Sequence, residues 1–202
     1  MSAAATLSTP PLRGASAHLA DELQAGRVYR REDLAVLSNA VDRHLHELST
    51  GMLKKLAQGL YYAPKQSNFG PLPPTDKEVV RGFLRDKKFL VFSSSPYNTV
   101  GLGTTLLYNS TLVYNHKRHS VFKLGNRAFN FRVKPRFPKK LTSEFLYVDL
   151  LNNLEELAED RDAVLSQACN KLMSFNQPRL QEALNSYGNM ATRKRVREWV
   201  GG

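Results

Sequence analysis

The chain has 202 residues, of which 42% are hydrophobic and 23% charged, and these proportions are typical of a globular chain with one large core or two small ones. No stretch approaches the roughly 20 consecutive apolar residues of a membrane helix, and no basic and apolar leader opens the sequence, so we expect a cytoplasmic protein without a membrane partner. The single cysteine, Cys169, excludes an internal disulfide and fits a reducing compartment.

The net charge of +11 indicates a polyanion as partner. This charge is concentrated in the middle third of the chain, since residues 71–140 carry 14 basic and 3 acidic side chains. Residues 1–70 carry a net charge of +2, and residues 141–202 a net charge of −2. Between Asp86 and Glu144 the sequence has eleven basic residues and no acidic residue, which predicts an extended basic surface.

The N-terminal part of the chain predicts three short helices behind a disordered tail. Residues 1–16 are rich in Ala, Ser, Thr and Pro and show no apolar period. Helical patterns follow, interrupted by a short extended segment, and the helices are expected over 17–25, from 31 and over 39–50. Asn39 is expected to cap the third helix by accepting a hydrogen bond from the backbone N–H of Asp42.

A β-hairpin is expected next, with strands over 52–56 and 60–62. Three helices followed by a hairpin is the order of a winged helix-turn-helix domain, whose third helix enters the major groove of DNA while the hairpin contacts the backbone. We therefore expect a DNA-binding domain over residues 17–64. The proline-rich residues 65–75 predict a stiff linker.

Residues 76–202 predict a second, mixed domain. A helix capped by Thr75 or Asp76 precedes a buried strand and a short helix that starts at Ser95. Three antiparallel strands and four helices are then expected, the strands over 111–114, 120–124 and 128–133 and the helices from 143 and over 162–175, 178–187 and 190–199. The predicted fold class is α+β, with an N-terminal winged helix-turn-helix followed by a mixed α/β domain that has an antiparallel sheet and C-terminal helices.

The third helix is the first candidate site. If Val41, Leu45 and Leu48 face the core, the other side chains form a polar outer face. Its hydrogen-bond donors suit base edges and phosphates, whereas the alternative is a solvated face without a partner. The candidate DNA-binding residues of this helix, the hairpin and the basic pair before them are Arg30, Arg31, Asn39, Arg43, His46, Lys54, Lys55 and Tyr61.

The basic segment over 116–140 is the second candidate site. In its last strand we expect Phe129 and Phe131 to face the core and Arg132 and Lys134 to face solvent. Such a basic sheet face is suited to the phosphates of DNA or RNA, or to an acidic protein surface. The residues assigned to it are Lys117, Arg118, Lys123, Arg127, Arg132, Lys134, Arg136, Lys139 and Lys140.

No catalytic or metal site is expected. The sequence has no Gly-rich phosphate loop ending in Lys-Ser/Thr, no Gly-x-Ser-x-Gly and no His-Glu-x-x-His. His44 and His46 are two residues apart, and side chains at that spacing point in different directions on a helix. Cys169 lies in an apolar helical stretch, which favours the core over a nucleophile. We therefore expect a protein that is not an enzyme and needs no cofactor and no metal.

Four motifs occur in a recognisable order between residues 17 and 200. They are Gln58-Gly59-Leu60-Tyr61, the run Tyr97-Asn98-Thr99-Val100-Gly101-Leu102-Gly103-Thr104-Thr105, Asp149-Leu150-Leu151-Asn152, and Tyr187-Gly188-Asn189 with Thr192-Arg193-Lys194. In these motifs the chain resembles the AbiEi family, the antitoxins of type IV toxin-antitoxin systems.

The resemblance implies a bacterial protein that lies on the nucleoid when bound to DNA. Its winged helix is expected to repress its own operon by binding inverted repeats in double-stranded DNA. Its larger domain is expected to neutralise a nucleotidyltransferase-fold toxin, in a system of phage defence. Two other functions stay open, a stand-alone winged-helix transcriptional regulator and an RNA-binding accessory protein that uses the basic sheet face.

Overall fold

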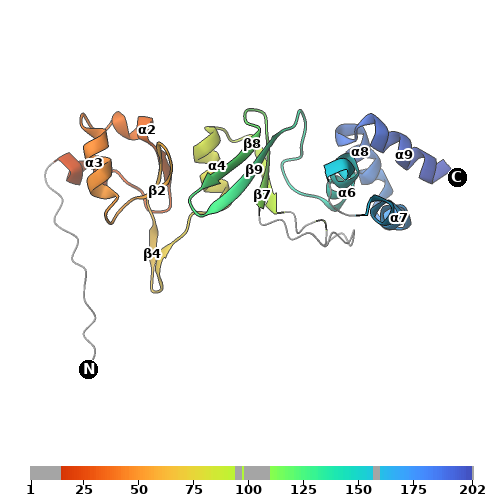
Figure 1. The fold of residues 1–202 in the computed structure, drawn as a ribbon, viewed down its shortest axis with the longest axis horizontal. Coiled ribbons are helices and arrows are strands. Elements are labelled where there is room, and N and C mark those ends of the chain that lie inside the picture. The colour runs from red at the N-terminus through yellow and green to blue at the C-terminus, as the bar shows by residue number, and fades with distance from the viewer. Residues whose placement is uncertain (1–14, 94–96, 98–109, 157–159, 202) are drawn as a thin grey trace, which may run out of the picture. The chain divides into compact units, whose positions relative to one another are not determined.

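The computed structural model describes residues 15–93, 97, 110–156 and 160–201 (Figure 1). They form two compact units. Unit 1 extends to Lys87 and includes Lys123–Arg127, and unit 2 comprises Lys88–Phe122 and the chain from Ala128 onward. The expected tail over 1–16 lies outside the described residues except for its last two residues, which belong to the first helix.

Unit 1 begins with helices packed on a small antiparallel sheet. In chain order its first elements are α1 (Ala15–Asp21), β1 (Val28–Arg30), α2 (Arg31–Ala35), α3 (Val41–Leu48), β2 (Lys54–Ala57) and β3 (Leu60–Tyr62). The strand order is β1-β3-β2, so β3 is hydrogen-bonded on both edges. The apolar side of α3 joins Leu19 and Leu34 in the core, because Val41, Leu45 and Leu48 are all buried. The expected helices and hairpin of this region are therefore present.

The start of α3 differs from the expectation. Ala40, not Asn39, is the residue that caps the helix, and its carbonyl accepts the N–H of His44. The side chain of Asn39 does not cap the helix, because the helix begins one residue later than the sequence pattern predicts. Ser38 takes over the local hydrogen bonding, since its hydroxyl oxygen accepts the N–H of Ala40 at 3.2 Å and lies 2.7 Å from Nδ1 of His44.

The segment over 65–75 forms a second hairpin where we expected a stiff linker. Strands β4 (Lys65–Ser67) and β5 (Gly70–Leu72) pair in an antiparallel register, with Gln66 opposite Pro71. A proline is tolerated there because each strand of a two-stranded ribbon has one edge without a partner strand.

Helix α4 (Asp76–Leu84) completes unit 1 and starts as predicted. Thr75 caps it through a reciprocal pair of hydrogen bonds with Glu78. Gly82 allows the helix to lie against β1, since a Cβ there would be 2.5 Å from a methyl carbon of Val28. The boundary between the compact units consequently falls at Lys87 and not within 65–75.

Most of a four-stranded sheet belongs to unit 2. Its strands are β6 (Phe89–Ser93), β7 (Ser110–Asn115), β8 (Ser120–Leu124) and β9 (Arg127–Val133), in the order β6-β7-β9-β8. The end of β8 and the first residue of β9, within Lys123–Arg127, belong to unit 1. The β6–β7 pair is antiparallel as expected, but β7 and β9 are parallel, with Tyr114 opposite Arg132. The expected antiparallel arrangement of all three later strands is therefore wrong. Strand β8 lies at the outer edge of the sheet, so β9 lies between β8 and β7 and pairs with β7.

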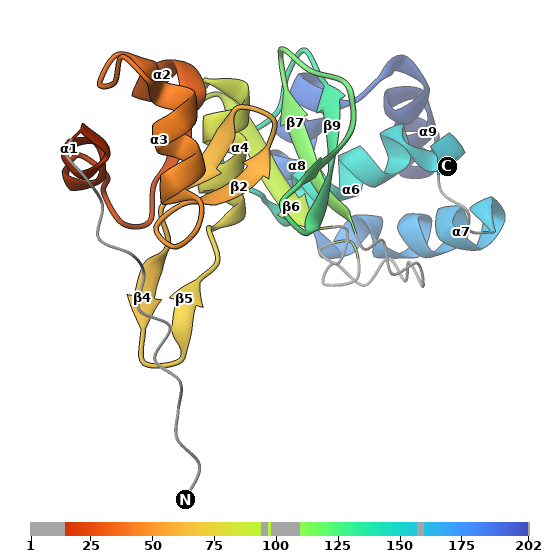
Figure 2. The same cartoon turned by 60° about the vertical axis from the view of Figure 1, so that its left-hand side comes forward.

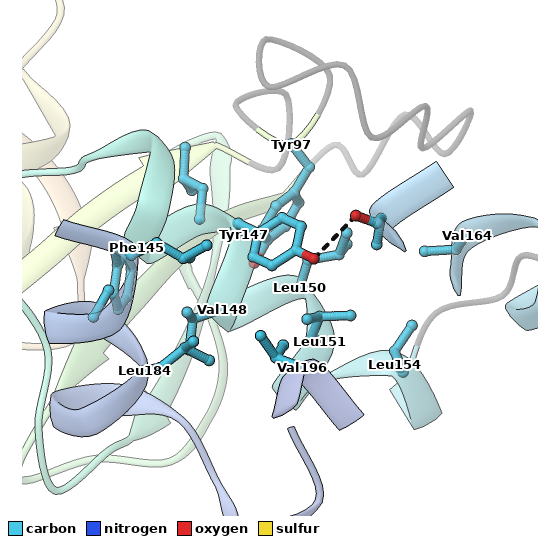
Figure 3. Close-up of a cluster of buried hydrophobic side chains, with 14 of the residues drawn as sticks. Tyr97, Phe145, Tyr147, Val148, Leu150, Leu151, Leu154, Val164, Leu184 and Val196 are labelled. Carbon is cyan, nitrogen blue, oxygen red and sulfur yellow. Dashed lines mark hydrogen bonds between the residues drawn. The ribbon is translucent and has the colours of Figure 1, made fainter. Parts of the chain in front are cut away.

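Helices from the C-terminal part of the chain pack on one face of this sheet. They are α6 (Ser143–Asn152), α7 (Arg161–Lys171), α8 (Gln177–Tyr187) and α9 (Met190–Gly201), with 3-10 turns at Leu154–Glu156 and Leu172–Ser174. Their core contains Tyr147, Leu150 and Leu184 (Figure 3). Leu90 and other sheet residues belong to the same core. The chain is thus α+β with antiparallel strands and C-terminal helices. The expected short helix from Ser95 falls outside the described residues, apart from Tyr97.

None of the helices in the described ranges is long and apolar enough to cross a membrane.

The close approach of α4 to β1 can be tested at Gly82. In Gly82→Ala the new methyl group would overlap Val28, so we expect the unfolding free energy to fall by about 1–3 kcal/mol. Urea denaturation followed by circular dichroism measures this change. Gly201→Ala is the matched control, because a Cβ at that helical glycine meets no atom within 4 Å in the described part of the chain. Equal unfolding midpoints for the two variants would contradict the packing.

Candidate functional site

The outward side of α3 carries the polar residues that the sequence predicted. Arg43 and His46 of the helix are exposed, as is Asn39 just before it, while the apolar residues of the helix are buried. The intervening His44 is 4% exposed and lies beside Ser38, so this histidine supports the helix from within. Side chains that donate hydrogen bonds thus project from a helix whose other side is anchored in the core.

The carboxylate of Asp42, in the first turn of α3, is paired with Arg31. The guanidinium of Arg31 donates to both carboxylate oxygens of Asp42, through Nε at 2.7 Å and Nη2 at 2.5 Å. The guanidinium lowers the pKa of Asp42, and the carboxylate raises the pKa of Arg31. Arg31 therefore compensates the negative charge on the first turn of α3.

Arg30 has a structural role where we expected a DNA contact. Its Nε donates to the carbonyl of Gly82 at 2.8 Å, and its Nη2 donates to the carbonyl of Phe83. The side chain is only 19% exposed. These carbonyls end α4, which the chain reaches some fifty residues later, so no local pattern could reveal the contact.

The first hairpin presents two cations at its edge. Lys54 and Lys55 are exposed on β2, opposite Tyr62 and Tyr61 of β3. Tyr61 is half-buried against the core of unit 1, so its ring supports the strand. The hairpin thus offers two lysine side chains of the kind that contact phosphates.

A depression lies next to the first turn of α3. It has a volume of about 320 Å³ and is lined by Arg43 of the helix and by Val36, Leu37 and Asn39 before it. Val36 is 85% exposed and Leu37 43% exposed. Apolar contacts of this kind suit the methyl group of thymine, and the neighbouring Arg43 suits guanine or phosphate.

The basic segment does not form one solvent-facing sheet surface. Arg127 binds Asp76 at 2.6 Å and the carbonyl of Pro74 at 2.7 Å. Arg132 is half-buried on the same face as Tyr114, and the Lys134 ammonium lies 5.2 Å from the centre of the Tyr114 ring. The other residues of the set are exposed, namely Lys117, Arg118, Lys123, Arg136, Lys139 and Lys140.

The predicted alternation of β9 is correct, but the assignment of its faces is wrong. Phe129 and Phe131 are fully buried as expected. The opposite face, which carries Arg132 and Lys134, is only partly exposed to solvent, because it is the face that contributes Tyr114 to the core beneath the helices. Lys134 also donates to the side-chain oxygen of Asn153 at 3.0 Å.

A buried carboxylate in unit 2 is the feature that sequence reasoning missed. Asp149 is 3% exposed, and its Oδ2 accepts the hydroxyl groups of Tyr97 at 2.6 Å and Tyr114 at 2.7 Å. Burial raises the pKa of Asp149, although the two tyrosine hydrogen bonds and the charge of Lys134 act in the opposite direction. Burial and the same carboxylate raise the pKa of both tyrosines.

A cavity of about 280 Å³ adjoins this carboxylate. Its lining includes Asp149 and Lys134 beside the exposed Arg136. Asn152 closes one side, since its amide donates to the carbonyl of Tyr187 at 2.9 Å and its oxygen accepts the N–H of Asn189 at 2.9 Å. The Asp149-to-Asn152 motif and the Tyr187-to-Asn189 motif, far apart in the sequence, therefore meet around one cavity.

No metal centre is evident in the ranges that the structure describes, where no group of three or more His, Cys, Asp or Glu side chains is placed to hold an ion.

The buried carboxylate makes a testable contribution to stability. Because the pKa of Asp149 is raised by folding, the folded chain keeps this proton to a higher pH than the unfolded chain. The unfolding free energy therefore falls as the pH rises from about 3.9, the ordinary Asp value, through the folded value. Asp149→Asn removes the titration, so its stability relative to the wild type should increase over this pH interval. A difference that stays constant with pH, in urea unfolding of both proteins, would contradict the assignment.

Comparisons with known proteins identify a shared fold. The chain matches neither a protein-family model nor a curated protein. Among solved structures it is similar to the crystal structure of the RV2827C protein from Mycobacterium tuberculosis, with a TM-score of 0.52 and 13% sequence identity. The match covers 92% of this chain and 74% of the other. At this identity the similarity establishes the fold alone.

Proposed function

We propose that the protein binds double-stranded DNA sequence-specifically through unit 1, as a winged helix-turn-helix regulator. The observation that carries the proposal is the β1-β3-β2 sheet, with α2 and α3 in the chain between β1 and β2. This pairing places a supported hairpin in the same small unit as a helix whose polar side is exposed. A helix for the major groove and a hairpin for the backbone are the two parts that such a domain needs.

The candidate DNA-binding residues of unit 1 divide into those that contact bases and those that contact phosphates. Arg43 is the residue best suited to a base edge, because it is exposed and the negative charge of neighbouring Asp42 is compensated by Arg31. Asn39 and His46 supply further hydrogen bonds. Lys54 and Lys55 contact phosphates, so they contribute affinity for any sequence.

We also propose that the protein represses its own operon, by binding inverted repeats in the promoter. The resemblance to the AbiEi antitoxins suggests this target. The stand-alone regulator is the alternative within the same class, and it differs only in having no toxin partner.

A second proposed function, neutralisation of a nucleotidyltransferase-fold toxin, rests on unit 2. The specific observation in its favour is that the motifs on which the resemblance depends converge there, Asp149 with Tyr97 and Asn152 with Asn189. Asp149, Asn152 and Asn189 line the same cavity, which is a place where a partner could bind. RNA binding by the sheet face is disfavoured, because Phe129 and Phe131 are fully buried and offer no surface for base stacking.

DNA readout by α3 is tested with Arg43→Ala. If Arg43 contacts a base edge, the variant should lose about 1–3 kcal/mol of binding free energy for the preferred site and should discriminate less between sites. Lys55→Ala should instead weaken binding to all duplexes and reduce the slope of log K against log salt by ~1. Gel shifts or fluorescence anisotropy on the promoter and on random DNA separate the two. Arg179→Ala, at an exposed arginine of α8, controls for loss of one positive charge. Equal losses on both duplexes for Arg43→Ala would exclude base readout.

The two proposed functions should be separable in the full-length chain. Arg43→Ala should relieve repression of a promoter reporter but still restore growth to cells that express the nucleotidyltransferase-fold toxin proposed as its partner. Asp149→Ala should show the reverse pattern, provided that circular dichroism shows a folded protein. Failure of the wild-type chain to restore growth would exclude the antitoxin function and would leave the regulator function intact.

A further inference from the structure

One aromatic ring of unit 1 is fully exposed to solvent. Phe69, in the turn between β4 and β5, is 102% exposed, whereas Phe129 and Phe131 of unit 2 are fully buried. A phenyl ring in water gives up the free energy that burial would supply. An isolated exposed apolar residue needs no explanation on a loose loop, but the turn that carries Phe69 is not loose.

The turn is held by side-chain hydrogen bonds. The hydroxyl of Ser67 donates to the carbonyl of Gly70 at 2.7 Å and accepts the N–H of Phe69 at 3.3 Å. Gly70 has a φ of +103°, a conformation that favours glycine, and it lets the chain return directly into β5. These hydrogen bonds and the glycine turn define the backbone conformation that presents the ring.

The base of the hairpin is fixed as well. The hydroxyl of Tyr62, on β3, donates to the carbonyl of Leu72 at 3.1 Å. The stem of Lys65 lies against Gly26, where an added Cβ would be 2.3 Å from the terminal methylene of the lysine. Figure 2 shows the ribbon projecting from the helices of unit 1, with its turn at the far end. Unit 1 thus carries a stiff arm with a phenyl ring at its end.

The chemistry of the arm suits a polyanion. From Lys65 to Thr75 the sequence has one lysine and no acidic residue. Gln66 and Asn68, beside the ring, are exposed amides that can both donate and accept hydrogen bonds. Lys54 and Lys55 of the first hairpin line a cavity of about 360 Å³ together with β5, so the arm adjoins the lysines assigned to DNA phosphates.

We propose that the β4–β5 hairpin is a second DNA-binding element, which inserts Phe69 between base pairs from the minor groove and bends the duplex. This inference rests on the proposed DNA-binding function. Apolar side chains at the end of an arm open a base step in this way, and amides next to them bind the acceptors on the minor-groove floor. Sequences with a flexible pyrimidine–purine step at the insertion point are then preferred, although no side chain reads that step directly.

The test uses the full-length chain and a duplex that this chain selects from a random pool. The duplex carries donor and acceptor dyes at its ends, which report bending, and a fluorescent base analogue, which brightens when its base is unstacked. The variants are Phe69→Ala, which removes the ring, and Phe69→Leu, which keeps an apolar wedge. Met190→Ala is the matched control, because it removes another exposed apolar side chain, 89% exposed, from unit 2. Unfolding midpoints establish that each variant is folded.

The wild type, Phe69→Leu and Met190→Ala should bend the duplex and brighten the analogue at one step. Phe69→Ala should bind the same site on the order of tenfold more weakly, with neither bending nor brightening. If Phe69→Ala bends and unstacks the duplex as the wild type does, the hairpin proposal is overturned while the DNA-binding function stands. If the wild type selects no duplex, the DNA-binding function itself fails.

Discussion

Strand β3 is only three residues long, yet unit 1 depends on the hydrogen bonds along its two edges. It pairs with β1 on one side and with β2 on the other, so a shift of either neighbour breaks backbone hydrogen bonds in a partly buried sheet. Its first residue, Leu60, is 2% exposed and lies near Gly82 of α4, and its last residue, Tyr62, holds the second hairpin through its hydroxyl. Helix α3, the β2–β3 hairpin and the β4–β5 hairpin of the proposed DNA interface are therefore positioned by one central strand.

The parts of unit 1 that the sequence predicts well are those determined by neighbours in the chain. The inward side of α3 follows from the helical period of Val41, Leu45 and Leu48, and the start of α4 follows from the spacing of Thr75 and Glu78. The partners of the arginines are not local in this sense. Arg30 meets carbonyl groups at the end of α4, so it resembles a DNA-binding cation until the tertiary fold is known.

In unit 2 the sequence indicates the alternation of β9 but not which face is covered. The period of two places Phe129 and Phe131 on one face and Arg132 and Lys134 on the other. The period does not indicate whether a second layer of helices covers the basic face. The signal for the buried site was present in α6, where residues 145–151 are buried on every side of the helix and include one acidic residue. A carboxylate in such a helix requires partners, and Tyr97 and Tyr114 supply them from distant segments.

The parallel pairing of β7 with β9 also has a consequence for the order in which the chain becomes ordered during synthesis. The antiparallel β6–β7 pair leaves the ribosome before β9, and the second edge of β7 then has no strand beside it in the sheet that the structure describes. That edge belongs to a strand rich in apolar residues, with Leu112, Val113 and Tyr114 in succession. Until β9 emerges and pairs, the nascent chain exposes a strand edge of the kind that recruits other chains, so slow synthesis between the two strands favours aggregation.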